Sequence, residues 1–312
     1  MARVTKVSPS IQLSQEGGKI QTPRPSINGI IVPFEKTPEG IVCPHFYELR
    51  WAFGCPYECA YCYLRGTGRG NKRPRYRPIE KVLNALDKAF RHPYFIENPT
   101  VFNSGELADS LMNPPLMEKI VDKFEEQDRH RLLLLTKSDK VGFLVENPRR
   151  RTIVSFSLNA DAVWRRWEFG TPPPEARMKA AKAVMEAGYE VRIRIDPVFP
   201  IDDWREHYEG FIYMLLSELP RAPERITLGT PRGLQKTINY SKDRSWTKWF
   251  AESSGWGRKL ATPLRREIYI FFLDKLDLLG FDRSRVALCK ETEAMWNALG
   301  MDKKKIRCNC IW

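Results

Sequence analysis

The sequence has no long hydrophobic segment. Its longest apolar runs, such as the four leucines at residues 132–135, are far shorter than the roughly 20 residues of a membrane-spanning helix. Residues 1–6 also lack the apolar core of a secretory signal. We therefore expect no membrane association and a cytoplasmic location. The length of 312 residues is ample for a packed core.

Histidine is scarce, with four residues in the whole chain. A structural zinc site needs four ligands, usually two C-x2-C pairs or paired cysteines and histidines. The only histidine near the main cysteine array is His45, and Cys308 and Cys310 form only a C-x-C pair. These shortages disfavour a zinc site. Seven cysteines in a chain of this length do not suggest a disulfide framework either, and they fit a reducing compartment.

What the sequence does contain is a compact C-x3-C-x2-C array made of Cys55, Cys59 and Cys62. Cysteine thiolates hold iron–sulfur clusters, and a four-iron cluster usually takes four of them. Three ligands leave one iron open, and an open position on a metal is where chemistry takes place. The spacing therefore favours a [4Fe-4S] cluster over a zinc site or buried thiols. It matches the signature of the radical S-adenosylmethionine enzymes, in which the open iron binds the amino and carboxylate groups of that cofactor.

The chain is strongly basic, with a formal charge of +13 and a pI of about 9.4. Such a charge favours a polyanionic partner, and nucleic acid first. Solvated surface lysines are the simpler explanation, so charge alone does not decide between them.

Strand-like and helix-like segments alternate from residue 46 onward. Six strand-then-helix units are predicted, with strands at 46–53, 100–103, 131–137, 152–159, 190–198 and 225–230 and helices at 78–91, 114–127, 140–146, 174–187, 203–218 and 264–279. This alternation predicts an α/β fold with a parallel sheet, and right-handed crossovers would curl it into a partial TIM-type barrel. We expect an N-terminal arm at 1–44, the barrel at 45–281 and a cysteine-containing C-terminal extension at 282–312.

Polar residues stand at the ends of the predicted strands, on the rim where barrel active sites lie. Each residue alone is weak evidence for a binding site, because polar residues at strand ends often only cap the strand. Together they are candidates to bind the cofactor: Ser104, Gly105 and Glu106 for its ammonium, Lys137 for its carboxylate, Ser157 and Asn159 for carboxylate or ribose hydroxyls, and also Arg194 and Asp196. Arg232, after the sixth strand, is a candidate substrate contact.

Residues 54–64, Gly-Cys-Pro-Tyr-Glu-Cys-Ala-Tyr-Cys-Tyr-Leu, resemble the motif of the spore photoproduct lyases. The later signatures follow in the same order: Thr136-Lys137, Phe156 to Ala160, Gly170-Thr171-Pro172, and Ala187-Gly188-Tyr189 leading into Ile195 to Val198. The resemblance covers roughly residues 45–275. It implies a partial barrel, a four-iron cluster and S-adenosylmethionine. It also implies that a 5′-deoxyadenosyl radical takes a hydrogen from a thymine-dimer lesion, which then reverts to two thymines.

By the same resemblance, Cys55, Cys59 and Cys62 match the cluster ligands. Tyr61 and Tyr63 match tyrosines near the hydrogen-transfer path, so both are catalytic candidates, and Tyr61 is a cofactor contact as well. The positions of Ser104, Lys137 and Ser157 match those around the cofactor's polar end.

The main departure from the family is Asn103. Spore photoproduct lyases carry a cysteine there that returns a hydrogen atom to the product radical, and an amide cannot do so. Three readings of the C-terminal thiols remain open. Cys308 and Cys310 are buried thiols in a packed tail, or they are catalytic as a replacement donor or redox pair, or they form a second metal site with Cys43 and Cys289.

Residues 233–262 interleave cations with aromatic residues, which predicts a substrate- or nucleic-acid-contacting insert with salt-dependent DNA binding. Trp256 and Arg258 are its candidate substrate contacts, because Trp256-Gly257-Arg258 is similar to a stretch near the family's lesion-contacting hairpin. The alternative is an irregular loop whose tryptophans pack on the barrel.

The sequence thus predicts a radical S-adenosylmethionine enzyme that acts on a nucleic-acid base, by carbon–carbon bond chemistry or base modification. It would receive electrons from a flavodoxin- or ferredoxin-type donor. One alternative is radical modification of a peptide or small molecule. Another is a non-catalytic iron–sulfur protein that binds nucleic acid.

Overall fold

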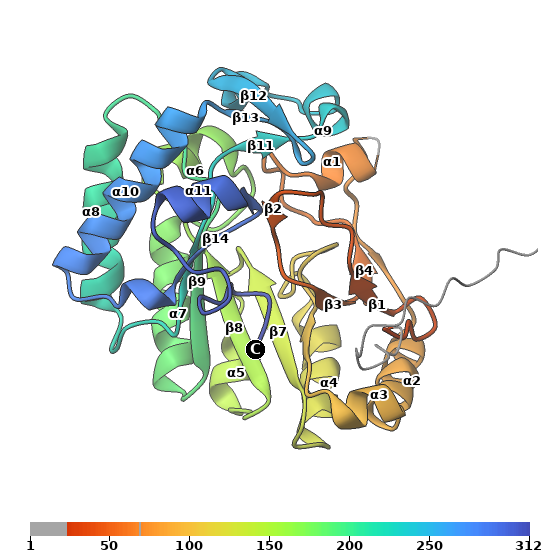
Figure 1. Cartoon of the computed structure of the whole chain (residues 1–312). Helices are drawn as coiled ribbons and strands as arrows, with labels where there is room; N and C mark the ends of the chain where they lie inside the picture. The colour runs from red at the N-terminus through yellow and green to blue at the C-terminus, as the bar shows by residue number, and fades with distance from the viewer. Residues whose placement is uncertain (1–23, 69) are drawn as a thin grey trace, which may run out of the picture.

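A mixed sheet of eight strands forms the centre of the molecule (Figure 1). The computed structural model describes residues 24–68 and 70–312, so the first 23 residues of the predicted arm lie outside it. The strand order is β1 (Ile31–Phe34), β3 (Phe46–Leu49), β6 (Val101–Asn103), β7 (Arg131–Thr136), β8 (Thr152–Ser157), β9 (Glu190–Ile195), β10 (Ile226–Leu228) and β14 (Val286–Leu288). Only β1 runs antiparallel to its neighbour, whereas every other pairing in this sheet is parallel. The predicted α/β class and its parallel sheet are confirmed.

The central strands are apolar because the chain covers both faces of the sheet. All residues of β8 are buried, and the leucine run of β7 is buried except at Leu135. Strands buried on both faces are expected to be continuously hydrophobic rather than alternating. The leucine run that is too short for a membrane is thus a core strand.

Helices follow the strands where the sequence predicts them. The helices that the sequence predicts are α2 (Ile79–Phe90), α4 (Pro114–Glu125), α5 (Gly142–Glu146), α7 (Pro174–Glu186), α8 (Trp204–Glu218) and α10 (Thr262–Leu278). Local signals explain their ends: Asn113 caps α4 by accepting from the Leu116 amide at 3.3 Å, and Gly188 follows α7 with a φ of 97°. The remaining helices are short: α1 (Leu64–Thr67), α3 (Pro93–Glu97), α6 (Asp161–Trp167), α9 (Gln235–Asn239) and α11 (Glu293–Ala298).

The C-terminal segment is part of the sheet. Its strand β14 pairs in parallel with β10, and β15 (Glu291–Thr292) pairs with β2 (Ile41–Val42) from the N-terminal region. The end of the chain then returns to the sheet, where the fully buried Asn309 side chain donates to Ser155 Oγ and Ile193 O, both at 2.9 Å. A boundary at residue 282 therefore falls before a strand of the same sheet.

The insert at 233–262 is folded rather than irregular. Strands β11 (Arg232–Gly233), β13 (Gly257–Leu260) and β12 (Phe250–Ser254) form a small antiparallel sheet, seen at the top of Figure 1 beside α9 and α1. Another short pair, β4 (Ala52–Phe53) and β5 (Arg75–Tyr76), flanks the cysteine array. In the ranges that the structure describes, no helix combines the length and the apolarity needed to cross a membrane.

Candidate active site

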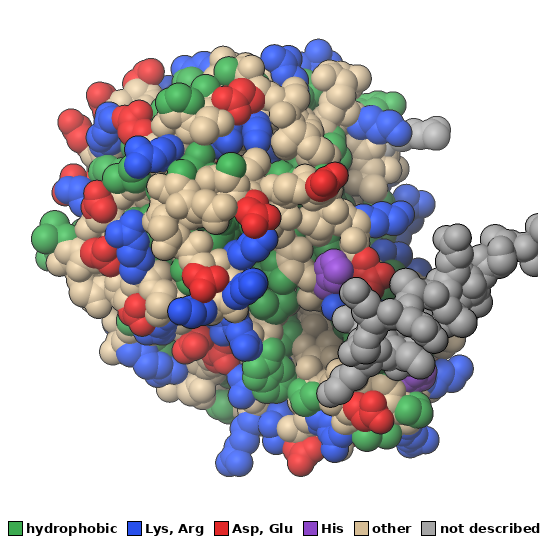
Figure 2. Space-filling view, in the orientation of Figure 1, with side chains coloured by type: hydrophobic (Ala, Val, Ile, Leu, Met, Phe, Trp, Pro, Cys, Tyr) green, Lys and Arg blue, Asp and Glu red, His purple; other side chains and the backbone are tan. Residues whose placement is uncertain are grey.

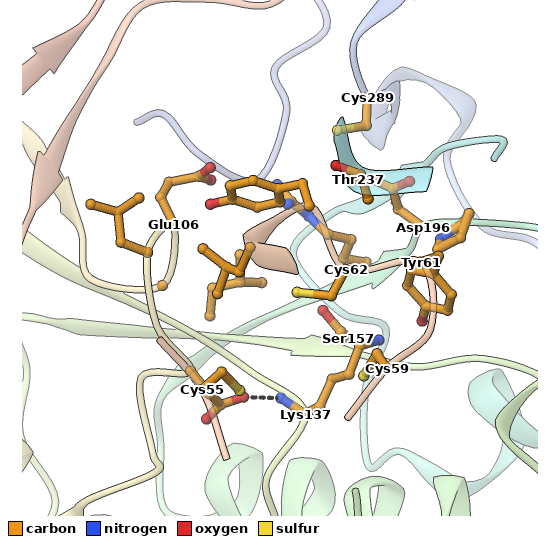
Figure 3. A pocket seen from close by; sticks show the side chains of 18 of the residues that line it. Cys55, Cys59, Tyr61, Cys62, Glu106, Lys137, Ser157, Asp196, Thr237 and Cys289 are labelled. Atoms are coloured by element: carbon orange, nitrogen blue, oxygen red, sulfur yellow. Dashed lines mark hydrogen bonds between the residues drawn. The ribbon is translucent and has the colours of Figure 1, made fainter. Parts of the chain in front are cut away.

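A cavity of about 330 Å³ opens at the carboxyl ends of the parallel strands. Its walls come from the cysteine array and from residues that directly end or follow β6, β7, β8, β9, β10 and β14. Most of the residues predicted for the site line it: Cys55, Cys59, Tyr61, Cys62, Tyr63, Gly105, Glu106, Lys137, Ser157, Arg194, Asp196, Arg232 and Trp256. Figure 3 shows ten of the lining residues by name, with Cys289 on the far side of the cavity from Cys55 and Cys59.

The cysteine array is a loop between β4 and α1, and backbone contacts fix its shape. The amides of Glu58 and Ala60 donate to the carbonyls of Phe169 and Trp167, each at 2.8 Å. Gly54, just before Cys55, has a φ of 90°, and a Cβ there would lie 2.6 Å from the Arg73 carbonyl oxygen. Only glycine fits this position without strain.

A buried arginine also holds the loop from inside. Arg65 is 2% exposed, and it donates to Cys59 O at 3.1 Å and to Glu58 O at 2.8 Å. Burial raises the pKa of Cys59 to about 12. The thiol therefore carries its proton until a metal displaces it, since metal binding releases the protons of its cysteine ligands.

The chemistry of the three thiols is what bears on the kind of metal centre. Within residues 24–68 and 70–312, no three His, Cys, Asp or Glu side chains gather closely enough to hold one metal ion. A mononuclear zinc site would need all its thiolates about 2.3 Å from one point. Cluster ligands are spread over several irons, and Cys55, Cys59 and Cys62 line one cavity without converging. The donor set thus fits an iron–sulfur cluster. The second metal site of Cys43, Cys289, Cys308 and Cys310 stays a hypothesis.

Asn103 fixes the turn that follows β6. Its Oδ1 accepts from the Gly105 amide at 2.9 Å, and its Nδ2 donates to Glu106 Oε1 at 3.2 Å. A Cβ on Gly105 would lie 2.4 Å from Leu135 Cβ, so the turn packs tightly on β7. The Asn103 amide thus orients the Glu106 carboxylate on the cavity wall.

Glu168 was not predicted, and it organises the wall beside the cysteine loop. Its fully buried carboxylate accepts from Tyr61 Oη, from Lys137 Nζ at 2.9 Å and from Arg177 Nη2 at 2.6 Å. Burial would raise the pKa of this group, but the two cations outweigh burial and lower it to about 2. The catalytic candidate Tyr61 and the cofactor-binding candidate Lys137 are therefore fixed by one buried anion. No sequence signal identified Glu168, although it lies two residues before the motif at residues 170–172.

A second ion pair closes another side of the cavity. Arg232 donates to both oxygens of Asp196, at 3.1 and 2.8 Å, and to Cys289 Sγ at 3.3 Å. Burial opposes ionisation of Asp196, but the Arg232 guanidinium outweighs it and lowers the pKa of Asp196 to about 2. Cys289 and Lys290, which follow β14, also line the cavity, and neither was predicted as an active-site residue in its own right.

Five predicted residues do not line the cavity. Ser104 Oγ donates to Leu133 O at 2.9 Å, and Asn159 Nδ2 donates to Pro197 O at 2.8 Å, so both act as internal braces. Cys310 Sγ accepts from Arg194 Nη2 at 2.9 Å behind the wall. The remaining residues outside the cavity lining are Cys308, which is half-buried, and Arg258, which is exposed on β13.

The aromatic residues of the insert divide into two groups. Trp246 borders the cavity, but it is fully buried and packs edge-on against Phe250, so it cannot stack on an exposed base. Trp256 stands in the turn between β12 and β13 and lines the cavity. On the face in Figure 2, basic side chains are interspersed with acidic ones and do not form one continuous basic surface.

Comparison with known proteins places these residues in a family. The family model described as spore photoproduct lyase matches residues 42–229. The chain belongs to the spore photoproduct lyase family. This is a family of radical S-adenosylmethionine enzymes, so its cofactors are those expected from the cysteine loop.

A curated relative agrees with this assignment. The spore photoproduct lyase of Bacillus subtilis strain 168 is 30% identical over 182 residues, covering 56% of this chain and 52% of that protein. The chain thus spans about half the length of the curated relatives that it matches.

Solved structures share the fold. A mutant spore photoproduct lyase with bound AdoMet and dinucleoside spore photoproduct has a TM-score of 0.64 at 21% identity, covering 78% of this chain and 75% of that one. SuiB of Streptococcus suis, bound to its precursor peptide SuiA, has a TM-score of 0.53 at 14% identity, covering 80% of this chain and 49% of that one.

Proposed function

We propose that this protein is a radical S-adenosylmethionine enzyme that acts on a base of a nucleic acid, with a thymine-dimer lesion as the first substrate to test. The observation that carries the proposal is that Cys55, Cys59 and Cys62 share one cavity with the residues at the strand ends. When bound, the cluster and S-adenosylmethionine supply a 5′-deoxyadenosyl radical, as the family resemblance implies. The curated relatives are spore photoproduct lyases, which supports the choice of lesion.

The residues of this chain have distinct roles in the proposal. Cys55, Cys59 and Cys62 hold the cluster, and Glu106 binds the cofactor's ammonium on a turn that Asn103 orients. Lys137 is already paired with Glu168. It therefore contributes less to the cofactor's carboxylate than the sequence suggested, and Ser157 and Arg194 are the nearer candidates on the wall. Tyr61 is held by the same glutamate, which restricts its hydroxyl.

A thiol on the cavity wall can take the place of the missing hydrogen donor. Cys289 lines the cavity beside Arg232, and burial raises the pKa of its thiol to about 12, so the hydrogen stays on sulfur near neutral pH. Cys308 and Cys310, the donors proposed from the sequence, do not line the cavity. We therefore place Cys289 first as the donor, with Cys310 behind Arg194 as the second candidate.

Modification of a peptide is the second candidate function. Asn103 favours it, because the thiol that completes lesion repair in the family is absent from its usual place. The fold does not distinguish a nucleic-acid substrate from a peptide substrate, because the spore photoproduct lyase and SuiB structures both share it.

Three further predictions accompany the proposed function. The parallel sheet forms a partial barrel of about six βα units, the protein works in the cytoplasm, and a flavodoxin- or ferredoxin-type protein donates the electron. An oxygen-sensitive cluster in a reducing compartment is the physical reason for the last two.

The test is an anaerobic assay with reconstituted cluster, dithionite, S-adenosylmethionine and a spore-photoproduct dinucleotide in D2O. Thiols exchange with solvent, so a cysteine donor predicts thymine that carries deuterium. Cys289→Ala should abolish the label, whereas the double variant Cys308→Ala/Cys310→Ala should retain it. The opposite pattern would assign the donor to the C-terminal pair, and release of 5′-deoxyadenosine without any thymine would favour the peptide alternative.

A further inference from the structure

Lys290 stands on the cavity wall inside an aromatic enclosure. Its Nζ lies 4.7 Å from the ring centre of Trp256, 5.5 Å from that of Phe34 and 6.0 Å from that of Tyr63. All four side chains line the cavity, although they come from β1, the cysteine loop, the β12–β13 turn and the segment after β14. The backbone of Lys290 is left-handed, with a φ of 52°, which is uncommon for a residue other than glycine. Four distant segments thus meet around one ammonium group.

The charge of this ammonium is not cancelled by an ion pair. Among the described residues, no carboxylate lies within 4.0 Å of Lys290 Nζ, whereas the neighbouring Arg232 is neutralised by Asp196 at 2.8 Å. Aromatic rings attract a cation through their quadrupole but carry no net charge. Burial opposes ionisation of Lys290, but the Glu106 carboxylate, which acts on it from beyond ion-pair distance, outweighs burial and raises the pKa of Lys290. Lys290 is therefore a cation at the cavity surface with no carboxylate in direct contact among the described residues.

A second cation on the same wall is only partly satisfied. Arg194 contacts the Cys310 thiol, and its buried Nε has no hydrogen-bond partner within the part of the chain that the structure describes. Buried donors are nearly always paired, so an unpaired one indicates a missing acceptor. Lys290 and Arg194 together indicate an anion that binds in the cavity.

Aromatic residues beside Lys290 indicate which class of anion binds in the cavity. Trp256 and Phe34 are parallel to within 10°, with ring centres 6.1 Å apart, and both face the same cavity as Lys290. Rings of this kind stack on nucleobases, and lysines beside them bind the phosphates that link those bases. We propose that Lys290 binds the phosphodiester that joins two adjacent nucleosides of the substrate, with Arg194 as a second contact. This inference rests on the proposed function for its substrate class, and it adds that Lys290 recognises the backbone phosphate between the two nucleosides.

The carboxylate of S-adenosylmethionine is another anion that could reach this wall. Glu106, the proposed contact for the cofactor's ammonium, also lines the cavity. The test therefore measures the cofactor and the dinucleotide separately.

The experiment is a binding titration, followed by tryptophan fluorescence, with two thymidine dinucleotides. One has the natural phosphodiester, and the other has an uncharged methylphosphonate in the same place. The wild-type protein should bind the charged form more tightly, on the order of ten-fold, which is the scale of one charge-assisted contact. Lys290→Met should remove this preference, and Lys290→Arg should keep most of it.

Lys275→Met is the matched control. Lys275 also stands over an aromatic ring, 5.9 Å from the centre of Phe271, but it is paired with Glu209 on the outer helices and does not line the cavity. This variant should keep the wild-type preference. Circular dichroism and thermal unfolding of each variant verify that the fold is intact.

Several results would overturn the inference. The wild-type protein could bind the two dinucleotides with equal affinity, or it could bind neither of them. The Lys290→Met variant could also keep the wild-type preference for the charged dinucleotide. Weaker S-adenosylmethionine binding in Lys290→Met, with the preference intact, would assign the anion to the cofactor instead. Formation of 5′-deoxyadenosine is measured independently, so the proposed radical chemistry can stand even if this site does not.

Discussion

The two sides of the cavity differ in how their charges are balanced. On the side of the cysteine loop, Glu168 is paired with both Lys137 and Arg177, and the loop itself is fastened by Arg65. On the side of the C-terminal segment, Arg232 is paired with Asp196, whereas Lys290 and Arg194 have no carboxylate at ion-pair distance within the described ranges. The first side lies mostly within residues 42–229, which match the family. On the second side Arg194 also lies within that match, whereas Cys289, Lys290 and Trp256 lie outside it.

This difference indicates a division of labour. A wall whose charges are already paired is rigid and suits a cofactor that must be held in one geometry. A wall with uncancelled cations attracts an anionic partner and suits the substrate. The residues on the side of the cysteine loop would then set the radical chemistry, and Lys290 with Arg194 would set what it acts on.

The largest expected effect comes from breaking the cysteine loop. Cys55→Ala, Cys59→Ala and Cys62→Ala should each leave the protein without a stable cluster, because only three ligands are available on this wall. Iron and sulfide content and the visible absorption of the reconstituted protein measure this loss. Cys43→Ala serves as the control and should retain the cluster; loss of iron in that variant would support a second metal site.

The next effect concerns Glu168. Glu168→Gln leaves Lys137 and Arg177 without their shared anion, and breaking a buried pair costs about 3–5 kcal/mol of unfolding free energy. Chemical denaturation measures this loss. Glu175→Gln removes an exposed partner of Lys179 on the same stretch of chain and should leave the midpoint unchanged.

Glu168 should also give stability a particular dependence on pH. Its pKa is about 2 in the folded state and 4.5 as a free side chain, so its contribution is complete above pH 4.5 and is lost as the pH falls toward 2. Denaturation between pH 5 and about pH 3 should show a steeper loss in the wild-type protein than in Glu168→Gln. Parallel curves for the two proteins would mean that the carboxylate is not held as an anion.

A smaller effect is expected where the C-terminal segment is fastened to the sheet. Asn309→Ala removes the donors to Ser155 Oγ and Ile193 O and the acceptor for Thr227 Oγ1. Leaving buried partners unsatisfied costs about 1–3 kcal/mol each, so hydrogen exchange in β9 and β10 should accelerate. Unchanged exchange would mean that the segment does not support this side of the cavity.

The smallest expected effects concern Trp256 and Arg258, the two residues of the insert that were predicted to contact the substrate. Trp256→Ala should weaken binding of single-stranded DNA by about 1–3 kcal/mol, since one stacked base is lost. Arg258→Ala, which alters an exposed position outside the cavity, should instead lower the slope of log affinity against log salt by about 1. Identical behaviour of the two variants would contradict the separation of the cavity from the outer surface.

The fold was predictable where hydrophobic pattern and local caps agree. Strand β7 is recognisable by its run of leucines, which is buried on both faces of the sheet. Helix α7 is recognisable by Pro174 at its start and by Gly188 just after its end. Strand β14 was missed because its residues Val286–Leu288 form a short strand within a mostly charged segment. Its place in the sheet depends on parallel pairing with β10, which no local pattern encodes.

The candidate site was predictable where the spacing of residues along the sequence is characteristic of a metal centre. Cys55, Cys59 and Cys62 are recognisable because cluster ligands must lie close together in the chain. Glu168 and Lys290 are not, because their partners come from distant segments and only the fold brings them together. Ser104 and Asn159 show the converse, since polar residues at strand ends can point into the protein as readily as into the cavity.

The most direct test of the account is the anaerobic formation of 5′-deoxyadenosine. The reconstituted protein is reduced with dithionite in the presence of S-adenosylmethionine and a spore-photoproduct dinucleotide, and both 5′-deoxyadenosine and thymine products are quantified. We predict that both form in the wild-type protein and that neither forms in Cys62→Ala. A wild-type protein with an intact cluster that releases no 5′-deoxyadenosine would contradict the central claim, and a non-catalytic iron–sulfur protein would then be the better description.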